Sequence, residues 1–219
     1  MACVEYNGTQ CLTGTSSGAM LAWRNREIEH ENKKLHGGVI DCIRVVHVDQ
    51  RTKDGGVEKV GRVLTGGRDM KINIFDATNL EKMPSSEGSL PLSTVDLSKK
   101  DEKGLYWGGS VCARPRALDM DVTGERLLIG TYGCELFTVA LSKASTSAFA
   151  SKIGAGSGGF PIAITRGHYA PKAKAAKADP VSNEVWGLCT CPSVGEEGQM
   201  HYVTVSDDAT LRLWDSNSH

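Results

Sequence analysis

The last part of the chain brings together side chains that commonly bind metal ions. Cys189 and Cys191 are separated by one residue, and His168 and His201 occur in the same region. Thiolate and imidazole groups are zinc ligands, but a structural zinc site usually needs two paired-ligand motifs, and a second such motif is lacking. Because residues two apart lie on one face of a strand, two core thiols account for the cysteine pair, and we predict no metal site.

A glycine-rich segment at residues 154–159 is a candidate phosphate cradle. A phosphate-binding P-loop ends in Gly-Lys-Ser/Thr, whereas Phe160 and Pro161 follow here, so a flexible linker is the better interpretation. Residues 14–18 (GTSSG) match the letters of the GxSxG motif, but they form the small-residue turn of a predicted hairpin and not a strand-to-helix nucleophile elbow. The HExxH motif does not occur in the sequence. We therefore predict no catalytic residue, no cofactor and no enzymatic activity.

The elements that would position any site are predicted by a recurring pattern. A few apolar residues are followed by a turn of small residues and then by an alternating strand. The copies are residues 11–23, 63–76, 127–139 and 203–215. Alternation of apolar and polar residues is typical of a strand with one buried face, and Gly, Ser, Asp and Asn favour tight turns. The pattern predicts repeated β-hairpins.

Further alternating segments precede the later hairpins. They occupy residues 39–48, 117–122 and 184–191, and residues 92–97 are one more candidate strand. The repeating unit is thus three or four short antiparallel strands, and helical periodicity is not sustained anywhere. We predict an all-β chain with repeats at 1–35 (partial), 36–97, 98–166 and 167–219.

Long polar stretches lie between or within these repeats. Residues 49–59, 99–109 and 170–180 are rich in charged residues, Gly, Ala or Pro, and we predict surface connections there. Lys172, Lys174 and Lys177 lie in the last of them. They could contact an acidic protein partner in a salt-sensitive manner, or belong to a solvated loop with no such role.

The composition excludes several classes of function. The chain has 219 residues, 7 cysteines and a formal net charge of -1. A near-neutral chain as a whole has no attraction to nucleic acid or anionic membranes. The first 14 residues lack the charged start and apolar run of a signal peptide. We predict a reduced, cytoplasmic protein without a nucleic acid or membrane partner.

Two dipeptides in the last repeat are more specific. His168 follows a glycine, and Trp214 precedes an aspartate, as in the GH and WD dipeptides of a propeller blade. The chain here resembles the WD-repeat family of β-propellers. The resemblance implies a buried hydrogen-bonded network in which His168 contacts Asp208, while the imidazole and the Trp214 indole both meet Ser206.

Other repeats keep only part of this set. His36 and Asp69 match the histidine and aspartate in the first complete repeat, where Phe75 replaces the tryptophan. Because Phe has no N–H group, we expect a shorter network there. The third repeat has Gly133 in place of the turn aspartate and has no tryptophan.

A narrower resemblance rests on three segments in order. Residues 11–23 (CLTGTSSGAMLAW), 124–137 (GERLLIGTYGCELF) and 167–188 (GHYAP followed by EVWGL) are similar to parts of the echinoderm microtubule-associated-protein-like (EMAP-like) family. The resemblance implies a non-catalytic scaffold that binds microtubules or tubulin at the cytoskeleton, including a cilium or flagellum. The alternative is a WD-repeat subunit of an unrelated complex, such as a ubiquitin ligase or an RNA-processing assembly.

The number of repeats raises a question of closure. About three and a half repeats are present, whereas a propeller needs at least four blades to close. An open array leaves exposed strand edges at both ends. We therefore predict a partial propeller of three to four blades, either a fragment or a chain whose ring is closed by a further propeller segment, and one that folds poorly alone.

Overall fold

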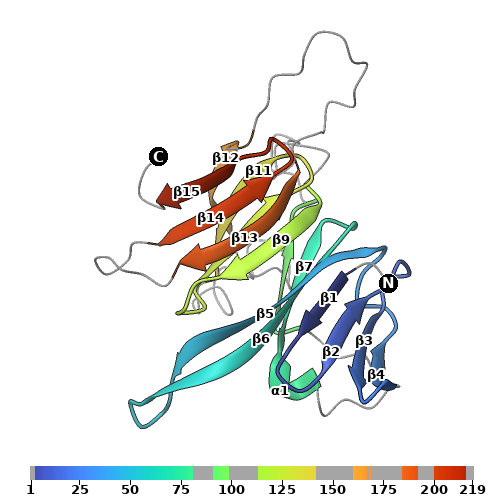
Figure 1. Ribbon diagram of the computed structural model, residues 1–219. Helices are drawn as coiled ribbons and strands as arrows, with labels where there is room; N and C mark the ends of the chain where they lie inside the picture. The colour runs from blue at the N-terminus through green and yellow to red at the C-terminus, as the bar shows by residue number, and fades with distance from the viewer. Residues whose placement is uncertain are drawn as a thin grey trace.

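Four antiparallel sheets make up the described part of the chain (Figure 1). The computed structural model describes residues 3–80, 91–98, 113–141, 160–166, 168, 184–191 and 200–215. Within each sheet the strands are hydrogen-bonded in chain order, so each sheet is a meander. We call the sheets blades 1 to 4. The all-β, partial-propeller prediction is confirmed.

The blades contain four, four, four and three described strands. Blade 1 comprises β1 (Cys3–Tyr6), β2 (Cys11–Gly14), β3 (Met20–Arg24) and β4 (Glu27–Asn32). Blade 2 comprises β5 (Ile40–Arg51), β6 (Val57–Gly67), β7 (Lys71–Asp76) and β8 (Ser93–Asp96), with the short helix α1 (Ala77–Leu80) after β7. Blade 3 comprises β9 (Pro115–Met120), β10 (Arg126–Thr131), β11 (Glu135–Ala140) and β12 (Phe160–Arg166). Blade 4 comprises β13 (Val185–Cys191), β14 (His201–Ser206) and β15 (Leu211–Asp215).

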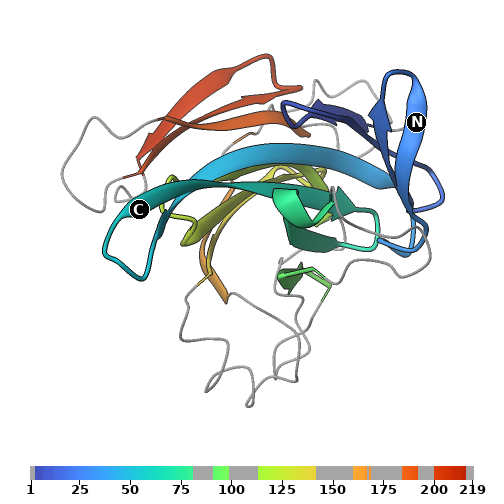
Figure 2. The same cartoon turned by 90° about the horizontal axis from the view of Figure 1, so that it is seen from below.

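The blades follow one another in chain order. The first strand of each blade, β1, β5, β9 or β13, packs against that of the next. Figure 2 shows blade 4 at the upper left and blade 1 at the upper right, with strands of blades 2 and 3 below them. Among the described residues, the buried hydrophobic clusters join neighbouring blades and none joins blade 4 to blade 1. The ring is therefore open between the first blade and the last.

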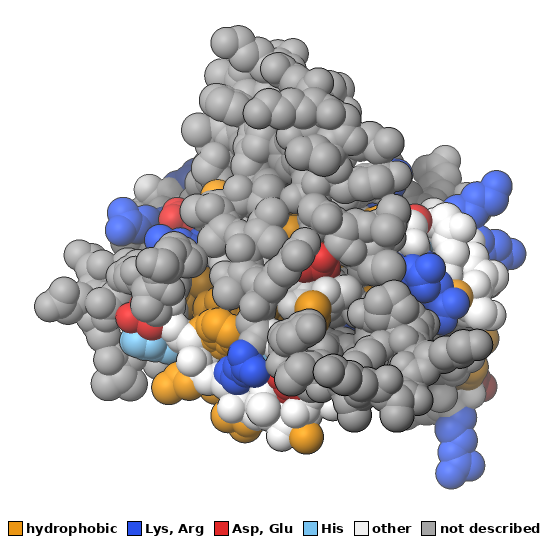
Figure 3. Space-filling view, turned by 90° about the horizontal axis from the view of Figure 1, so that it is seen from above, with side chains coloured by type: hydrophobic (Ala, Val, Ile, Leu, Met, Phe, Trp, Pro, Cys, Tyr) orange, Lys and Arg blue, Asp and Glu red, His pale blue; other side chains and the backbone are white. Residues whose placement is uncertain are grey.

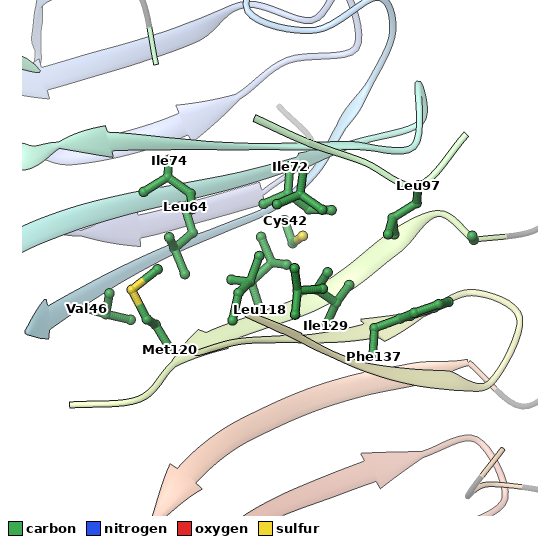
Figure 4. Close-up of a cluster of buried hydrophobic side chains, with 14 of the residues drawn as sticks. Cys42, Val46, Leu64, Ile72, Ile74, Leu97, Leu118, Met120, Ile129 and Phe137 are labelled. Atoms are coloured by element: carbon green, nitrogen blue, oxygen red, sulfur yellow. The ribbon is translucent and has the colours of Figure 1, made fainter. Parts of the chain in front are cut away.

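The core is divided among the contacts between neighbouring blades. The largest cluster joins blades 2 and 3, and Figure 4 shows Leu64, Ile72 and Ile74 of blade 2 pointing toward Ile129 and Phe137 of blade 3. Smaller clusters join blade 1 to blade 2 and blade 3 to blade 4. Because each blade buries both faces only when it has two neighbours, its stability depends on the blades beside it.

The hairpin between the second and third strands has a left-handed residue at the same place in every blade. These residues are Gly18, Met70, Cys134 and Ala209, with φ angles between 60° and 82°. A side chain at Gly18 would place Cβ 2.1 Å from the carbonyl oxygen of His36, so only glycine fits there. The other three blades adopt this conformation with an L residue, at a cost in backbone energy.

The prediction of a surface connection at residues 49–59 is wrong for most of that segment. β5 and β6 continue as a paired ribbon to Arg51 and Val57, with Asp49 opposite Lys59. Only residues 52–56 connect them, closed by hydrogen bonds between the backbones of Thr52, Gly55 and Gly56. Opposite charges facing each other across the ribbon favour the paired form. No described helix has the length and hydrophobicity that crossing a bilayer requires.

Candidate functional site

Each blade carries a buried threonine near the end of its second strand. These residues are Thr13, Thr65, Thr131 and Thr204. In blades 1, 2 and 4 the threonine pairs with a residue of the third strand. An aromatic residue follows two positions later on that strand. The hydroxyl groups are therefore placed where the aromatic residue and the start of the blade can both reach them.

In blade 4 the threonine is the centre of a hydrogen-bond network. The fully buried His168 lies with Nδ1 3.0 Å from Asp208 Oδ2 and with Nε2 2.6 Å from Thr204 Oγ1. Trp214 Nε1 donates to the same Thr204 oxygen at 2.7 Å. The network ties the segment before blade 4 to the second strand, the turn and the third strand at once.

The role predicted for Ser206 is corrected by this geometry, because Thr204 fills it. Trp214 pairs with Tyr202 across the ladder, so Thr204 is the nearest hydroxyl on that face. Ser206 lies four residues from Tyr202, about 13 Å along an extended strand, which is beyond the reach of the indole. Its hydroxyl instead accepts a hydrogen bond from the Asp208 backbone at 3.4 Å.

The Asp208 carboxylate is held in its charged form. Burial alone would raise its pKa, but hydrogen bonds from Thr210 and His168 outweigh this and lower the pKa below the ordinary value. Thr210 donates its hydroxyl to Asp208 Oδ1 at 2.6 Å. The described partners of this carboxylate, His168, Thr210 and Arg212, all belong to blade 4 or to the segment just before it, so the carboxylate holds the blade together.

Blade 2 contains a shorter version of the same network. His36 Nδ1 lies 2.9 Å from Asp69 Oδ1, and its Nε2 lies 2.9 Å from Thr65 Oγ1. Burial raises the pKa of Asp69, but hydrogen bonds from His36 and the Gly37 backbone outweigh it and lower the pKa. Phe75 takes the tryptophan position and donates no hydrogen bond, as its side chain requires.

Blades 1 and 3 satisfy the threonine in other ways. Trp23 Nε1 donates to Thr13 Oγ1 at 2.8 Å, which repeats the indole contact of blade 4. In blade 3 the position of Thr65 and Thr204, four residues before the turn residue Gly133, is taken by Ile129. The buried Thr131 lies two residues further on and donates to Glu135 Oε2 at 2.7 Å. Sequence reasoning missed these threonines, although in blades 2 and 4 they stand four residues before the turn aspartate. All four networks lock a blade internally, and none forms an open site.

A second group of polar and aromatic side chains does reach solvent. We call it the Arg116 surface, and it consists of Arg114, Arg116, Tyr132, Glu184 and Trp186. Arg116 and Trp186 are the second residues of the first strands of blades 3 and 4, and Tyr132 follows β10. The backbone N–H of Tyr132 donates to the Arg114 carbonyl at 2.9 Å, which fixes the turn beside the strand. The surface thus spans two neighbouring blades.

The guanidinium of Arg116 is held from several sides. It lies 5.3 Å from the centre of the Tyr132 ring and 5.1 Å from that of Trp186. Its Nε is 2.8 Å from Glu184 Oε2, and Nη1 is 3.5 Å from Asp41 Oδ1 on blade 2. Burial, with the negative charge of Asp207, raises the pKa of Glu184 despite the opposing effect of Arg116. Cation–π contacts and ion pairs therefore fix the arginine in one orientation.

Trp186 is the exposed large hydrophobic residue of the Arg116 surface, with 52% of its area open to solvent. Its indole N–H donates to Asp207 in the turn between β14 and β15, so the exposed ring is anchored. Large aromatic rings held rigidly at a surface are typical of protein-binding hot spots. This group was not predicted, because its residues lie far apart along the chain.

A cavity of about 650 Å³ opens where the far ends of the inner strands meet the β9–β10 turn. Asp119 lines it and accepts hydrogen bonds from the backbone and hydroxyl of Thr190 at 2.6 and 3.0 Å, which links blade 3 to blade 4. Arg44 approaches the same carboxylate at 3.8 Å. The lining mixes both charges with apolar groups and is largely engaged in contacts between blades.

The remaining predicted sites have different outcomes. Lys172, Lys174, Lys177 and residues 154–159 lie outside the described residues. Within the described ranges there is no group of three or more His, Cys, Asp or Glu side chains that could hold a metal ion. The interpretation of the cysteine pair as core thiols is wrong for Cys189, which is exposed.

Comparison with known proteins extends the description of the fold. No family model matches the chain, and no curated protein matches its sequence. The chain is similar to the solved β-propeller domain of Cps50 (Swd1) from Myceliophteria thermophila, with a TM-score of 0.56 and 17% sequence identity. The match covers 97% of this chain and 53% of that one, so the chain spans about half the length of that propeller. At this identity the likeness concerns the fold alone, and the chain has the fold of an incomplete β-propeller.

Proposed function

We propose that this chain is a non-catalytic WD-repeat scaffold that binds a protein partner through the Arg116 surface. The observation that supports the proposal is the exposed Trp186 ring, held by Asp207 and packed against a fixed arginine. Trp, Tyr and Arg are the residues most enriched at binding hot spots, and all three types meet here. A surface that is already ordered loses little conformational entropy when a partner docks.

The partner that we propose is the microtubule or its tubulin subunits, and the proposed location is the cytoplasm, at the cytoskeleton or in a cilium. The support is the similarity of three ordered segments to the EMAP-like family. The second candidate is a subunit of an unrelated multiprotein complex, such as a ubiquitin ligase or an RNA-processing assembly. A rigid aromatic and arginine surface suits either class, so the experiment has to decide between them.

Co-sedimentation with polymerised tubulin at low salt tests the assignment. The unmodified chain is expected in the pellet, and Trp186→Ala is expected to weaken binding about tenfold or more. Val57→Ala is the control, since Val57 is also an exposed apolar residue but lies near the tip of the β5–β6 ribbon. An unmodified chain that stays in the supernatant would remove the tubulin assignment and favour the second candidate.

If Trp186→Ala still binds tubulin normally, the assignment of tubulin as the partner stands, but the binding site lies outside the Arg116 surface. The lysines at 172, 174 and 177 would then be the next surface to test, by replacing all three with Ala. Because tubulin surfaces attract cations through charge, loss of binding at higher salt is expected for contacts of the lysines and less so for the Arg116 surface, whose charges are paired.

A further inference from the structure

The two faces of a blade have different neighbours. The threonine face is the one that carries Thr13, Thr65, Thr131 and Thr204, and the opposite face carries the alternate residues of the same strands. Phe75 and Val63 on the threonine face of blade 2 pack against Leu12 of blade 1. Leu64 and Ile72 on the opposite face of blade 2 pack against Ile129 of blade 3. The threonine face therefore meets the preceding blade, and the opposite face meets the following one.

The same rule holds between blades 3 and 4. Leu128 and Leu136 on the opposite face of blade 3 are buried in one cluster with Tyr202 of blade 4, and Trp214 packs against it. Tyr202 and Trp214 share the threonine face of blade 4, because they pair with each other two residues from Thr204. Three successive contacts thus use the same two kinds of face, always in the same direction.

Blade 4 leaves its opposite face open among the described residues. Leu211 and Leu213 occupy the positions that Ile72 and Ile74 occupy in blade 2, counted from the turn aspartate. Their exposed fractions are 67% and 68%, against 0% and 4% for the two isoleucines. Val205, which pairs with Leu211, is exposed on the same face. These are apolar side chains at positions that a following blade covers elsewhere in the molecule.

Blade 1 leaves its threonine face open in the complementary way. Tyr6, Trp23 and Ile28 form a row across this face through the ladder pairs of β1 to β4. Tyr6 is 65% exposed, and Ile28 is also exposed, whereas Phe75 at the position of Trp23 is buried in blade 2. Figure 3 shows that hydrophobic side chains also reach the surface on the side of the molecule seen from above.

We propose that a second copy of this chain covers both open faces. The opposite face of blade 4 in each copy packs against the threonine face of blade 1 in the other, around a two-fold axis. The two contacts are equal by symmetry and repeat the contact that already joins neighbouring blades within one chain. Four blades from each copy give an eight-bladed ring, which lies within the range of known propellers.

Two further observations support a second copy as the occupant. The open faces are the two halves of one type of contact, so the chain carries the complement of each of its own surfaces. The match also covers 53% of the solved β-propeller domain, so two copies correspond to about its length. Within one chain the described strands of blade 4 do not pack against blade 1, which leaves both faces available.

The mass of the purified 219-residue chain in solution is the first test. Size-exclusion chromatography with light scattering is expected to give twice 23.5 kDa at micromolar concentration. Leu213→Asp on blade 4 and Tyr6→Asp on blade 1 are each expected to give monomers, because a carboxylate would be buried in both contacts. Val57→Asp and Leu92→Asp introduce the same charge at exposed apolar positions elsewhere and are expected to remain dimers.

Mixing the two monomeric variants tests the direction of the contact. A mixed pair contains one contact with both substitutions and one contact with neither, so dimers are expected to reappear in the mixture. A dimer made by two copies of the blade 4 face would be unaffected by Tyr6→Asp and would overturn the proposal. A monomer at all concentrations, or a larger assembly, would also overturn it.

Hydrogen exchange of the unmodified chain gives a measurement that needs no variant. Amide protection in β1 and β15 is expected to rise with protein concentration, while protection in β6 and β7 changes little because those strands are covered within one chain. Protection in β15 that does not depend on concentration would contradict the proposed contact. Circular dichroism of each variant verifies that its blades remain folded.

Discussion

Blades 2 and 4 are built on the same plan and differ mainly in their neighbours. Both contain a histidine, a threonine and an aspartate in one network, with closely similar distances. Blade 2 lies between two other blades, whereas blade 4 has a described neighbour on one face only. The comparison separates two sources of stability, because the network is internal to a blade and the apolar contact is shared between blades.

The largest difference is expected when the equivalent apolar residues of the two blades are truncated. Ile72→Ala is expected to lower the free energy of unfolding by about 3 kcal/mol, since it leaves a cavity between blades 2 and 3. Leu211→Ala, measured at a concentration where the chain is monomeric, is expected to cost less than about 0.5 kcal/mol. Urea denaturation measures both, and equal losses would show that Leu211 is covered within one chain.

The second prediction compares the central threonines. Thr204→Val leaves both His168 and Trp214 without their hydroxyl partner, so we expect a loss of about 2 kcal/mol in the free energy of unfolding. Thr65→Val deprives only His36 and is expected to cost about half as much. Thr204→Ser keeps the hydroxyl and is the control. A larger effect at Thr65 would mean that the indole contact contributes little.

The third prediction concerns pH. Hydrogen bonds lower the pKa of Asp69 and Asp208 below the ordinary value of 3.8, even though burial opposes them. The carboxyls hold their protons less tightly in the folded chain than in the unfolded chain. Their contribution to the free energy of unfolding is therefore complete above the unfolded pKa. It is lost as pH falls from about 4 through the lower folded values. Asp69→Asn is expected to reduce this acid dependence, measured by urea denaturation between about pH 2 and 6.

The smallest expected effect comes from the left-handed turn residues. Ala209→Gly is expected to raise the free energy of unfolding by about 0.5–1 kcal/mol, because it removes the cost of a positive φ at an L residue. Met70→Gly relieves the same strain in blade 2 but removes a side chain that packs on the core, so it is expected to lower stability. Thermal unfolding compares the two, and a gain at Met70 would mean that its packing is weak.

Sequence reasoning identified the strands better than their long-range contacts. The hairpins were predictable because alternation and turn residues are local signals, and residues 92–97 do contain a strand. Thr204 and Ser206 share one strand face, so spacing alone could not select the threonine; the register with Tyr202 and Trp214 selects it. The β5–β6 ribbon was missed because charged residues and glycines were given more weight than the pairing across it.

The Arg116 surface could not be predicted for a different reason. Asp41, Arg116 and Trp186 come from three blades, and only the packing of the first strands side by side brings them together. Trp186 belongs to the EVWGL segment of the EMAP-like resemblance, but that segment alone does not indicate that the ring is exposed beside Arg116. The exposure of Leu211 and Leu213 could not be predicted either. Alternation marks both as core residues and does not reveal that their face is open.

The direction built into each blade has a consequence for errors in assembly. A blade whose opposite face binds the threonine face of the next blade can always add another blade. A single contact therefore sets no limit on the number of blades that join. Only curvature ends the series, by bringing the last side back to the first. A substitution that flattened the angle between two blades while preserving their contact would therefore convert a finite particle into an unbounded polymer.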